Sequence, residues 1–429
     1  MGFMASDGDK SRTAILRWLS DLTPTERKSM VACFGGWTLD AFDAQVFSFV
    51  IPTLLAIWGI SKGQAGLLAA STLVISAFGG WGAGAIGDRI GRVRVLQVTI
   101  VWYTLFTFLS GFAQNFEQLF ICRALQGFGF GGEWSAGAVL IGEVIRDRYR
   151  GRAVGFVQSG WAIGWGAAAL IYTFLFTMVP EALAWRIMFW LGLAPALLVI
   201  WIRRNVQESD IYKSRHPNSP IISQVFSVLK PPYLTLTLRV SMMIAGAQAG
   251  IYTISTWLPT YLKTVRGLSV ENAGSFLLLH IFCALLGYIW GSYMADSVGR
   301  KWTFVIAAIG SAFLILLYML APLSNTAVFL LGGPLGFVVY SMFAPMGSYL
   351  TELYPTQVRG CGQGFCYNAG RAAGALFPAL TGFLSERLGL GAAIAVFGAA
   401  AYGVMLLALL MLPETVGRPL DTIQSPALS

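Results

Sequence analysis

The stretch GAIGDRIGRVR at residues 84–94 returns in altered form as YMADSVGRK at residues 293–301. The two copies share an aspartate and a Gly-Arg pair, which are Asp88, Gly91 and Arg92 in the first and Asp296, Gly299 and Arg300 in the second. A second motif recurs at nearly the same offset, with Glu143, Arg150, Gly151 and Gly155 matched by Glu352, Arg359, Gly360 and Gly364. Two independent motifs at one offset indicate two similar halves in the same orientation, as in membrane proteins with parallel repeats.

The composition of the 429-residue chain is that of a membrane protein. Hydrophobic residues make up 56% of the sequence and charged residues only 11%, whereas soluble domains carry about 25% charged residues. Apolar runs able to cross a hydrocarbon core about 30 Å thick recur along the whole length. We therefore expect an all-α membrane protein with roughly twelve transmembrane helices in two pseudo-symmetric six-helix bundles.

The expected spans fall into two sets separated by a polar linker. The first set lies near 31–58, 64–87, 95–113, 117–145, 153–178 and 184–203. The second set lies near 234–263, 271–295, 302–321, 326–353, 361–385 and 389–412. The chain then divides into a cytoplasmic segment at 1–30 with an interfacial helix, a bundle at 31–203, a linker at 204–233, a bundle at 234–412 and a cytoplasmic tail at 413–429. Thr23-Pro24-Thr25-Glu26 has the pattern of a helix capping box.

The net charge of +9 is explained by its distribution. Most Lys and Arg residues lie in the termini, the linker and the loops on one side, and the opposite loops hold only Lys62, Arg186, Lys263, Arg266 and Arg387. This bias follows the positive-inside rule, so both termini are expected in the cytoplasm and the protein in the cytoplasmic (inner) membrane. The charge therefore orients the chain in the bilayer, and a nucleic-acid partner is not expected.

Two short motifs carry a resemblance to a known family. The stretch from Gly84 to Arg92 fits G-x-x-x-D-R-x-G-R, and Arg123, Gln126 and Gly127 fit R-x-x-Q-G. Together they resemble the signatures of the major facilitator superfamily over essentially the whole chain. The resemblance implies transport by alternating access, by a protein expected to work as a monomer.

The resemblance also implies a gate made of loop charges at the cytoplasmic helix ends. Its members would be Asp88, Arg92, Glu143, Arg150, Asp296, Arg300, Glu352 and Arg359. The alternative is that these charges only orient the helices by the positive-inside rule. Both roles can hold for the same residues.

The glycines of CRALQGFGFGGEW at 122–134 spell G-x-G-x-x-G, the pattern of a dinucleotide-binding loop. Such a loop follows a buried strand and opens a helix, whereas here one apolar run passes straight through the glycines. We expect them instead to form a packing surface on a membrane helix, with Gly127 and Gly131 one turn apart.

Acidic residues inside the expected spans are candidates for proton coupling. Asp40 and Asp43 lie three residues apart in the first span, on one helical face, and Glu133 lies in the fourth. A charge at the bilayer centre costs at least about 2.5–3.5 kcal/mol, so such residues are usually functional. Two close carboxylates also disfavour joint ionisation, which suits a site that holds a proton. Fixed structural pairing is the alternative.

Basic, polar and aromatic residues in the spans are candidates for binding a carboxylate substrate. They are Arg123 and Gln126 in the fourth span, Trp161 and Trp165 in the fifth, and Asn368 and Arg371 in the eleventh. The planar fork of an arginine binds a carboxylate through two hydrogen bonds. The alternatives are a permanent ion pair for each arginine and ordinary core packing for the tryptophans.

The motifs favour proton-coupled uptake (symport) of a small organic acid anion, aromatic or another monocarboxylate. LDAFD at 39–43 resembles the aromatic-acid:proton symporters, and WLPTYL at 257–262 resembles the sialate:proton symporters. A proton-driven efflux antiporter is the main alternative, and a non-transporting membrane sensor is a weaker one. With two His and five Cys that form no C-x-x-C pair, no enzyme, metal site or cofactor is expected.

Overall fold

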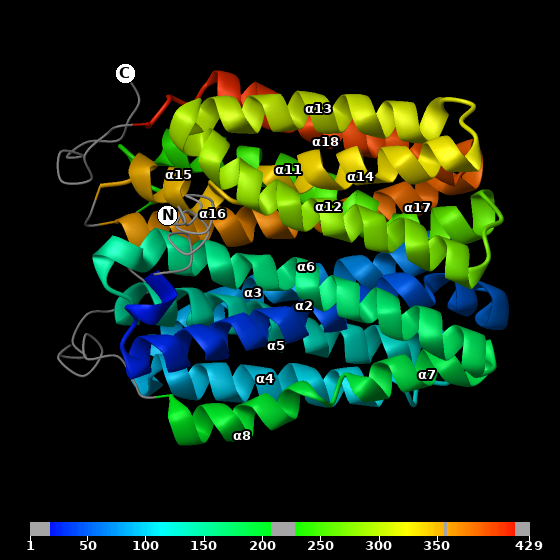
Figure 1. Cartoon of the computed structure of the whole chain (residues 1–429), viewed down its shortest axis with the longest axis horizontal. Helices are drawn as coiled ribbons and strands as arrows, with labels where there is room; N and C mark the ends of the chain where they lie inside the picture. Colours follow the sequence, from blue (N-terminus) through cyan, green and yellow to red (C-terminus); the bar gives the residue numbers. More distant parts are fainter. Residues whose placement is uncertain (1–17, 207–227, 356–357, 417–429) are drawn as a thin grey trace, which may run out of the picture.

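The structure is a computed structural model that describes residues 18–206, 228–355 and 358–416. At some positions within helices, including Asp88, Glu143 and Arg150, only the backbone is described. All regular elements of the described ranges are helices, which run side by side along the long axis of the molecule (Figure 1). The expected all-α class is therefore confirmed.

The helices of the N-terminal half match the first set of expected spans. In order they are α2 (Pro24–Trp58), α3 (Lys62–Ile90), α4 (Arg92–Ser110), α5 (Phe116–Val144), α6 (Asp147–Met178), α7 (Glu181–Leu191) and α8 (Pro195–Asn205). The sixth expected span is thus broken into α7 and α8. Pro195 stands at the start of α8, where its missing N–H costs no helical hydrogen bond.

The helices of the C-terminal half match the second set. They are α11 (Leu234–Thr260), its π-helical continuation η1 (Tyr261–Val265), α12 (Val270–Ser297), α13 (Arg300–Leu320), α14 (Asn325–Ser341), α15 (Met346–Leu353), α16 (Arg359–Gly374), α17 (Phe377–Leu388) and α18 (Leu390–Leu410). Ten helical segments in the described ranges are long and apolar enough to cross a membrane. The other two expected spans, 117–145 and 361–385, correspond to α5 and to the α16–α17 pair.

The start of α2 confirms the predicted capping box. The Thr23 hydroxyl accepts the backbone N–H of Glu26 at 3.2 Å, and the Glu26 carboxylate accepts the N–H of Thr23 at 2.8 Å. Of the expected interfacial helix, only residues 18–22 are described: 18–20 are helical, and the chain turns at 21–22. Most of the expected linker (207–227) and of the tail (417–429) lies outside the described residues, so the proposed domain boundaries stay predictions.

The glycine run of α5 is a packing surface, as predicted. A Cβ added at Gly127 would lie 2.2 Å from the Thr72 carbonyl oxygen, and one at Gly131 would lie 1.6 Å from that of Ser76. On another face of α5, a Cβ at Gly129 would lie 2.8 Å from the carbonyl oxygen of Thr99. The glycines therefore let α5 approach the backbones of α3 and α4 more closely than any side chain allows.

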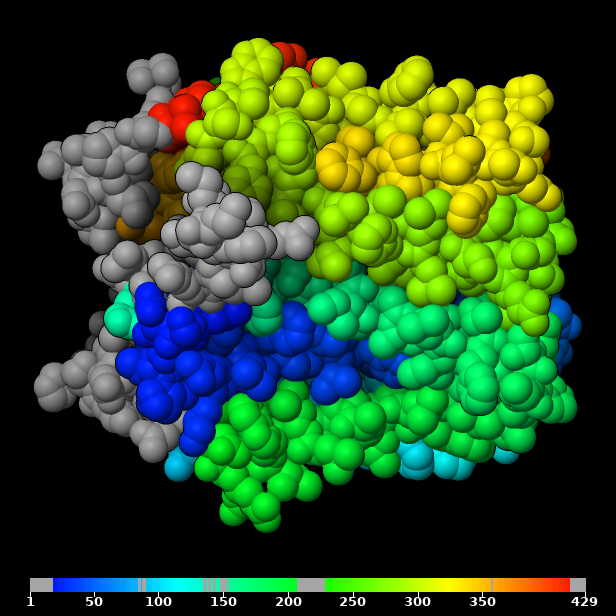
Figure 2. Space-filling view, in the orientation of Figure 1, coloured from blue at the N-terminus to red at the C-terminus, as the bar shows by residue number. Residues whose placement is uncertain are grey.

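The two halves meet along a seam that runs the length of the bundle. We call the end that holds residues 18, 206, 228 and 416 the terminal end, and the opposite end the far end (Figure 1). On the face shown in Figure 2, side chains of α6 and α12 meet along the seam toward the far end.

The far end is closed by close contacts between the halves. A Cβ at Gly66 of α3 would lie 2.6 Å from the Pro378 carbonyl oxygen, and one at Gly382 of α17 would lie 2.3 Å from that of Lys62. At the same end, Lys263 of η1 forms a 2.7 Å ion pair with Glu181 of α7. Backbone-level packing thus seals this end of the central region.

Candidate functional site

A chain of hydrogen bonds links the expected cation and one expected carboxylate of the N-terminal half. Arg123 donates from Nη1 to Oε1 of Gln126 at 2.6 Å, and Gln126 donates from Nε2 to Oδ2 of Asp43. The Thr107 hydroxyl of α4 lies 2.9 Å from the same Oδ2. The guanidinium also lies 4.6 Å from the ring centroid of Phe47, a cation–π contact. Residues from α2, α4 and α5 therefore form one buried polar network.

The two remaining carboxyl groups lie close together. Asp40 interacts electrostatically with Glu133 of α5 and with Tyr103 of α4, and all three are buried. The Glu133 carboxylate lies over Gly36, where an added Cβ would be 2.3 Å from Oε1. Glycine at position 36 therefore makes the space that brings this carboxyl group toward Asp40.

Arg371 of α16 lies at the seam between the halves. Its guanidinium carbon is 5.6 Å from the ring centroid of Phe130 in α5 and 5.0 Å from that of Tyr367 in its own helix. The residue is 2% exposed, and its Nε and Nη1 atoms have no hydrogen-bond partner in the described part of the molecule. It interacts electrostatically, without an ion pair at contact distance, with Asp40 and Glu133.

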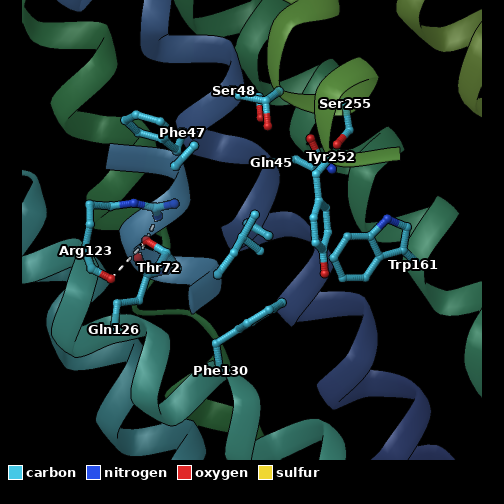
Figure 3. A pocket seen from close by; sticks show the side chains of 14 residues that line it. Gln45, Phe47, Ser48, Thr72, Arg123, Gln126, Phe130, Trp161, Tyr252 and Ser255 are labelled. Atoms are coloured by element: carbon cyan, nitrogen blue, oxygen red, sulfur yellow. Dashed lines mark hydrogen bonds between the residues drawn. The ribbon is translucent and has the colours of Figure 1, made fainter. Parts of the chain in front are cut away.

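A small cavity of about 40 Å³, lined by residues of α2, α3, α5, α6 and α11, lies beside this network. In Figure 3, Arg123, Gln126 and Phe130 face it from α5, and Tyr252 and Ser255 face it from α11. Ligand pockets usually enclose about 300–1,000 Å³, so in this state the cavity has room for a few waters but not for an organic acid. The site must widen before a substrate can enter.

The expected aromatic and amide residues occupy different places. Trp161 lines the cavity and lies 5.0 Å, between ring centroids, from Trp37. Trp165 is fully buried and contacts His280 of α12, with centroids 5.4 Å apart, so it packs across the seam. Asn368 donates to the Gly364 carbonyl oxygen at 3.0 Å, and its Oδ1 has no partner in the described residues.

The expected gating charges are described mainly in the C-terminal half. Arg300 donates to Asp296 at 2.8 Å and lies 3.4 Å from Glu352, and Arg359 donates to the Tyr354 carbonyl oxygen at 3.3 Å. These contacts all lie within one half. In the N-terminal half Arg92 is buried, but the side chains of Asp88, Glu143 and Arg150 lie outside the described ones.

The sequence reasoning missed three members of the site. Tyr103 and Thr107 of α4 are the neighbours of Asp40 and Asp43, and Tyr252 of α11 lines the cavity from the other half. Tyr103 and Thr107 are one helical turn apart in an expected span without charged residues, a signal that could have identified them. Within the described residues, no group of three or more His, Cys, Asp or Glu side chains is arranged to hold a metal ion.

Comparison with known proteins identifies the family. The chain matches the Major Facilitator Superfamily over residues 32–292 and again over 277–427. A probable 4-methylmuconolactone transporter of Cupriavidus pinatubonensis is 40% identical over 406 residues, which cover 95% of each chain. A sialic acid transporter of Escherichia coli is 28% identical and covers 91% of this chain and 95% of its own. The crystal structure of a D-xylose-proton symporter has a TM-score of 0.75 at 20% identity, over 91% of this chain and 99% of that one.

These relatives are transporters and not enzymes, and the shared fold is the arrangement of helices described above. The resemblance predicted from the loop motif and the internal repeat is thereby confirmed. The chain is a multi-pass membrane transporter and belongs to the major facilitator superfamily.

Proposed function

We propose that the protein takes up a small organic acid anion together with protons, by alternating access, across the cytoplasmic membrane. The terminal end of the bundle then faces the cytoplasm, because most basic loop residues lie there. The protein works as a monomer, with the acid and protons as its only required partners. A relative named for 4-methylmuconolactone and another named for sialic acid support an organic acid as the cargo.

The charge balance of the buried site is the observation that carries this proposal. Three buried carboxyl groups (Asp40, Asp43 and Glu133) accompany two buried guanidinium groups (Arg123 and Arg371). With every group ionised the site is negative, and one bound proton makes it neutral. Because net charge in a membrane interior is costly, an incoming anion calls for a further proton. Anion and proton therefore enter together.

Arg371 and Arg123 are the proposed ligands of the substrate carboxylate. Arg371 has two unpartnered guanidinium nitrogens, Nε and Nη1, and each can donate a charge-assisted hydrogen bond to a carboxylate oxygen. Trp161, Trp165, Asn368 and Gln126 complete the expected binding region. Trp161, on the cavity wall, is placed to contact the apolar part of the acid.

The transport cycle opens and closes the seam around this site. The described state is closed at the far end, which would be the outer side of the membrane. Release of the far-end contacts would widen the cavity toward the outside and admit the acid. The loop charges, including Asp296, Arg300 and Glu352, would stabilise the state that is closed at the terminal end. A gate also formed by Asp88, Arg92, Glu143, Arg150 and Arg359 remains part of this proposal.

Uptake into proteoliposomes tests the function. We would impose a pH gradient, acidic outside, and measure accumulation of radiolabelled benzoate, sialate and lactate. Symport of a monoanion with one proton is electroneutral and would accumulate the acid about tenfold per pH unit. An internal pH dye would report acidification that depends on the acid.

Two outcomes would contradict symport. Acid-dependent alkalinisation of the lumen would indicate an antiporter, and binding of the acids without flux would indicate a sensor. Arg239→Ala is a matched control, because Arg239 is a half-buried arginine of α11 that donates to the Met411 carbonyl oxygen, away from the site. Its uptake should equal that of the unsubstituted protein.

A further inference from the structure

Gln126 stands between the cation and a carboxylate of the N-terminal half. Its Oε1 accepts from Arg123 and its Nε2 donates to Asp43. The side chain is 1% exposed, so little water competes for these bonds. No direct ion pair at contact distance joins Arg123 to Asp43 in the described part of the chain. The two charged groups are therefore linked through the amide group of Gln126.

The two ends of that amide have different hydrogen-bonding roles. The NH₂ end only donates, and the Oε1 end only accepts. An ionised carboxylate only accepts and a guanidinium only donates, so the observed orientation is the one that an ionised Asp43 and a charged Arg123 require. A protonated Asp43 has a hydrogen to donate, and the NH₂ group of Gln126 cannot accept it.

Thr107 is a second hydrogen-bond partner of Asp43, and its hydroxyl can take two orientations. Its hydroxyl lies 2.9 Å from Asp43 Oδ2 and also 2.9 Å from the Tyr103 carbonyl oxygen, but it has one proton to donate. It can donate to an ionised Asp43, or donate to the carbonyl and accept from a protonated Asp43. In the second orientation Asp43 is neutral, so the hydrogen bond from Gln126 to Asp43 is no longer charge-assisted. Hydrogen bonds between neutral groups are about half as strong as charge-assisted ones.

We propose that Gln126 is a positioning residue that makes Nη1 of Arg123 available to the substrate carboxylate only when Asp43 is protonated. With Asp43 ionised, the amide is held firmly and occupies Arg123 Nη1. Protonation loosens the amide, or lets it turn over so that Oε1 accepts from Asp43, and either change releases Nη1. This inference rests on the proposed function and gives the site a physical link between proton and anion.

Other charged and titratable groups near Asp43 limit what can be assigned to it. Among the described residues, Arg123 faces it from α5, Tyr103 from α4 and Asp40 from its own helix. Asp40 in turn faces Glu133 and Arg371. A test must therefore separate the link through Gln126 from a general change in the charge of the site.

Gln126→Met provides that separation, because it keeps the length of the side chain and removes both amide ends without changing charge. We expect accumulation of benzoate, sialate or lactate under a pH gradient to fall at least tenfold. Exchange of the same acid at equal pH, which needs no net proton movement, should fall much less than accumulation does. The KM of the Gln126→Met variant for the acid should not show the pH dependence that the KM of the unsubstituted protein shows. Gln248→Met, at another buried glutamine, is the matched control and should change neither.

Gln126→Glu is a second variant that keeps the shape of the side chain. A protonated glutamic acid offers one donor and one acceptor, like the amide, whereas an ionised one pairs with Arg123 and keeps it occupied. Exchange by the Gln126→Glu variant should therefore be fast at low pH and lost at high pH. This pH dependence would not follow from a purely structural role.

The possible results separate the inference from the function. If the unsubstituted protein accumulates acid but Gln126→Met keeps its pH profile, or loses exchange and accumulation equally, the inference is wrong and symport stands. If the unsubstituted protein accumulates none of the three acids under the gradient, the proposed function is wrong and the inference falls with it.

Discussion

Arg123 and Arg371 are both buried cations near the seam, but their surroundings differ. Arg123, in the N-terminal half, donates to Gln126, and the amide of Gln126 in turn donates to Asp43. Arg371, in the C-terminal half, lies between the rings of Phe130 and Tyr367 and keeps two unpartnered nitrogens. One arginine is integrated in a network of titratable groups, and the other is held by aromatic faces.

This difference suggests a division of roles between the halves. The buried carboxyl groups of the described site, Asp40, Asp43 and Glu133, all belong to the N-terminal half. Protons would therefore bind on one side of the seam, while the C-terminal half offers a constant positive charge on the other. A substrate carboxylate between Arg123 and Arg371 would join the two halves only when the N-terminal half is suitably protonated.

Removal of the constant charge should have the largest effect. Arg371→Ala deletes a charge-assisted, two-point contact to the substrate, and hydrogen bonds to charged groups contribute about 1.5–3 kcal/mol each. We expect initial uptake of the transported acid in proteoliposomes to fall about 100-fold or more. Arg371→Lys keeps the charge but not the planar fork, so it should retain an intermediate rate.

Arg239→Ala serves as the control for this prediction, since it removes a half-buried arginine outside the site. Near-normal uptake by Arg371→Ala would mean that Arg371 is only a structural cation among aromatic rings. The contrast between the two arginines would then have no functional meaning.

Removal of a titratable group should affect coupling more than binding. Asp43→Asn cannot exchange a proton, so the pH gradient should no longer drive accumulation, with an expected loss of about tenfold per imposed pH unit. Exchange of labelled acid at equal pH should persist. The measurement is the ratio of accumulation to exchange, and equal losses of both would instead place Asp43 in substrate binding or folding.

Substitutions that disturb the packing of the helices carrying Arg123 and Arg371 should have a smaller effect. A Cβ at Gly131 would lie 1.6 Å from the Ser76 carbonyl oxygen of α3, and one at Gly370 would lie 2.6 Å from the Ile244 side chain of α11. Gly131→Ala meets backbone at the shorter distance and should be the more destabilising. Gly370→Ala, which also meets the Ala245 backbone nitrogen at 2.9 Å, should be destabilising to a lesser extent. Overpacking typically costs about 1–3 kcal/mol.

The measurement is the midpoint of thermal unfolding in detergent, followed by uptake. Gly403→Ala is the control, because a Cβ at that position of α18 has no neighbour within 4 Å. It should be neutral or slightly stabilising, since alanine favours a helix over glycine by up to about 1 kcal/mol. If Gly131→Ala were equally harmless, the tight fit of α5 against α3 would be wrong.

The fold was predictable because its signals are strong and local. The apolar runs, the repeated motifs, the capping box at Thr23 and the glycine spacing around Gly127 each follow from one stretch of chain, and the structure bears them out. Burial of Asp43, Arg123 and Arg371 followed in the same way from charges within apolar spans.

The partners within the site were less predictable because they depend on helix rotation and tertiary packing. The sequence motif placed Arg123 and Gln126 in one span, but it did not show that Gln126 separates Arg123 from Asp43. Nor did it indicate that Tyr252, distant in sequence, lines the cavity. Such contacts are set by how α2, α5 and α11 pack together.

Removal of a contact at the far end should have the smallest effect. Such contacts nevertheless hold the two halves, and with them the two arginines, together at the seam. Glu386, just beyond the expected span at 361–385, accepts the backbone N–H of Gly63 at 3.1 Å, at the start of α3. The Ser61 hydroxyl and this N–H lower the pKa of the Glu386 carboxyl group in the closed state. Ionisation therefore favours closure above the ordinary carboxyl pKa, and the contribution is lost as pH falls through the lowered value.

Glu386→Gln should accordingly open the far end slightly more often. We expect the cavity-lining variant Thr256→Cys to react about two- to threefold faster with an impermeant maleimide added from the far side when Glu386 is replaced. Background labelling of the native cysteines is subtracted. At low pH the two rates should converge, because the Glu386 carboxylate is then protonated. Equal rates at neutral pH would show that closure at this end does not depend on the Glu386 charge, and that the glycine contacts and the Lys263–Glu181 ion pair are sufficient to keep Arg371 against Phe130.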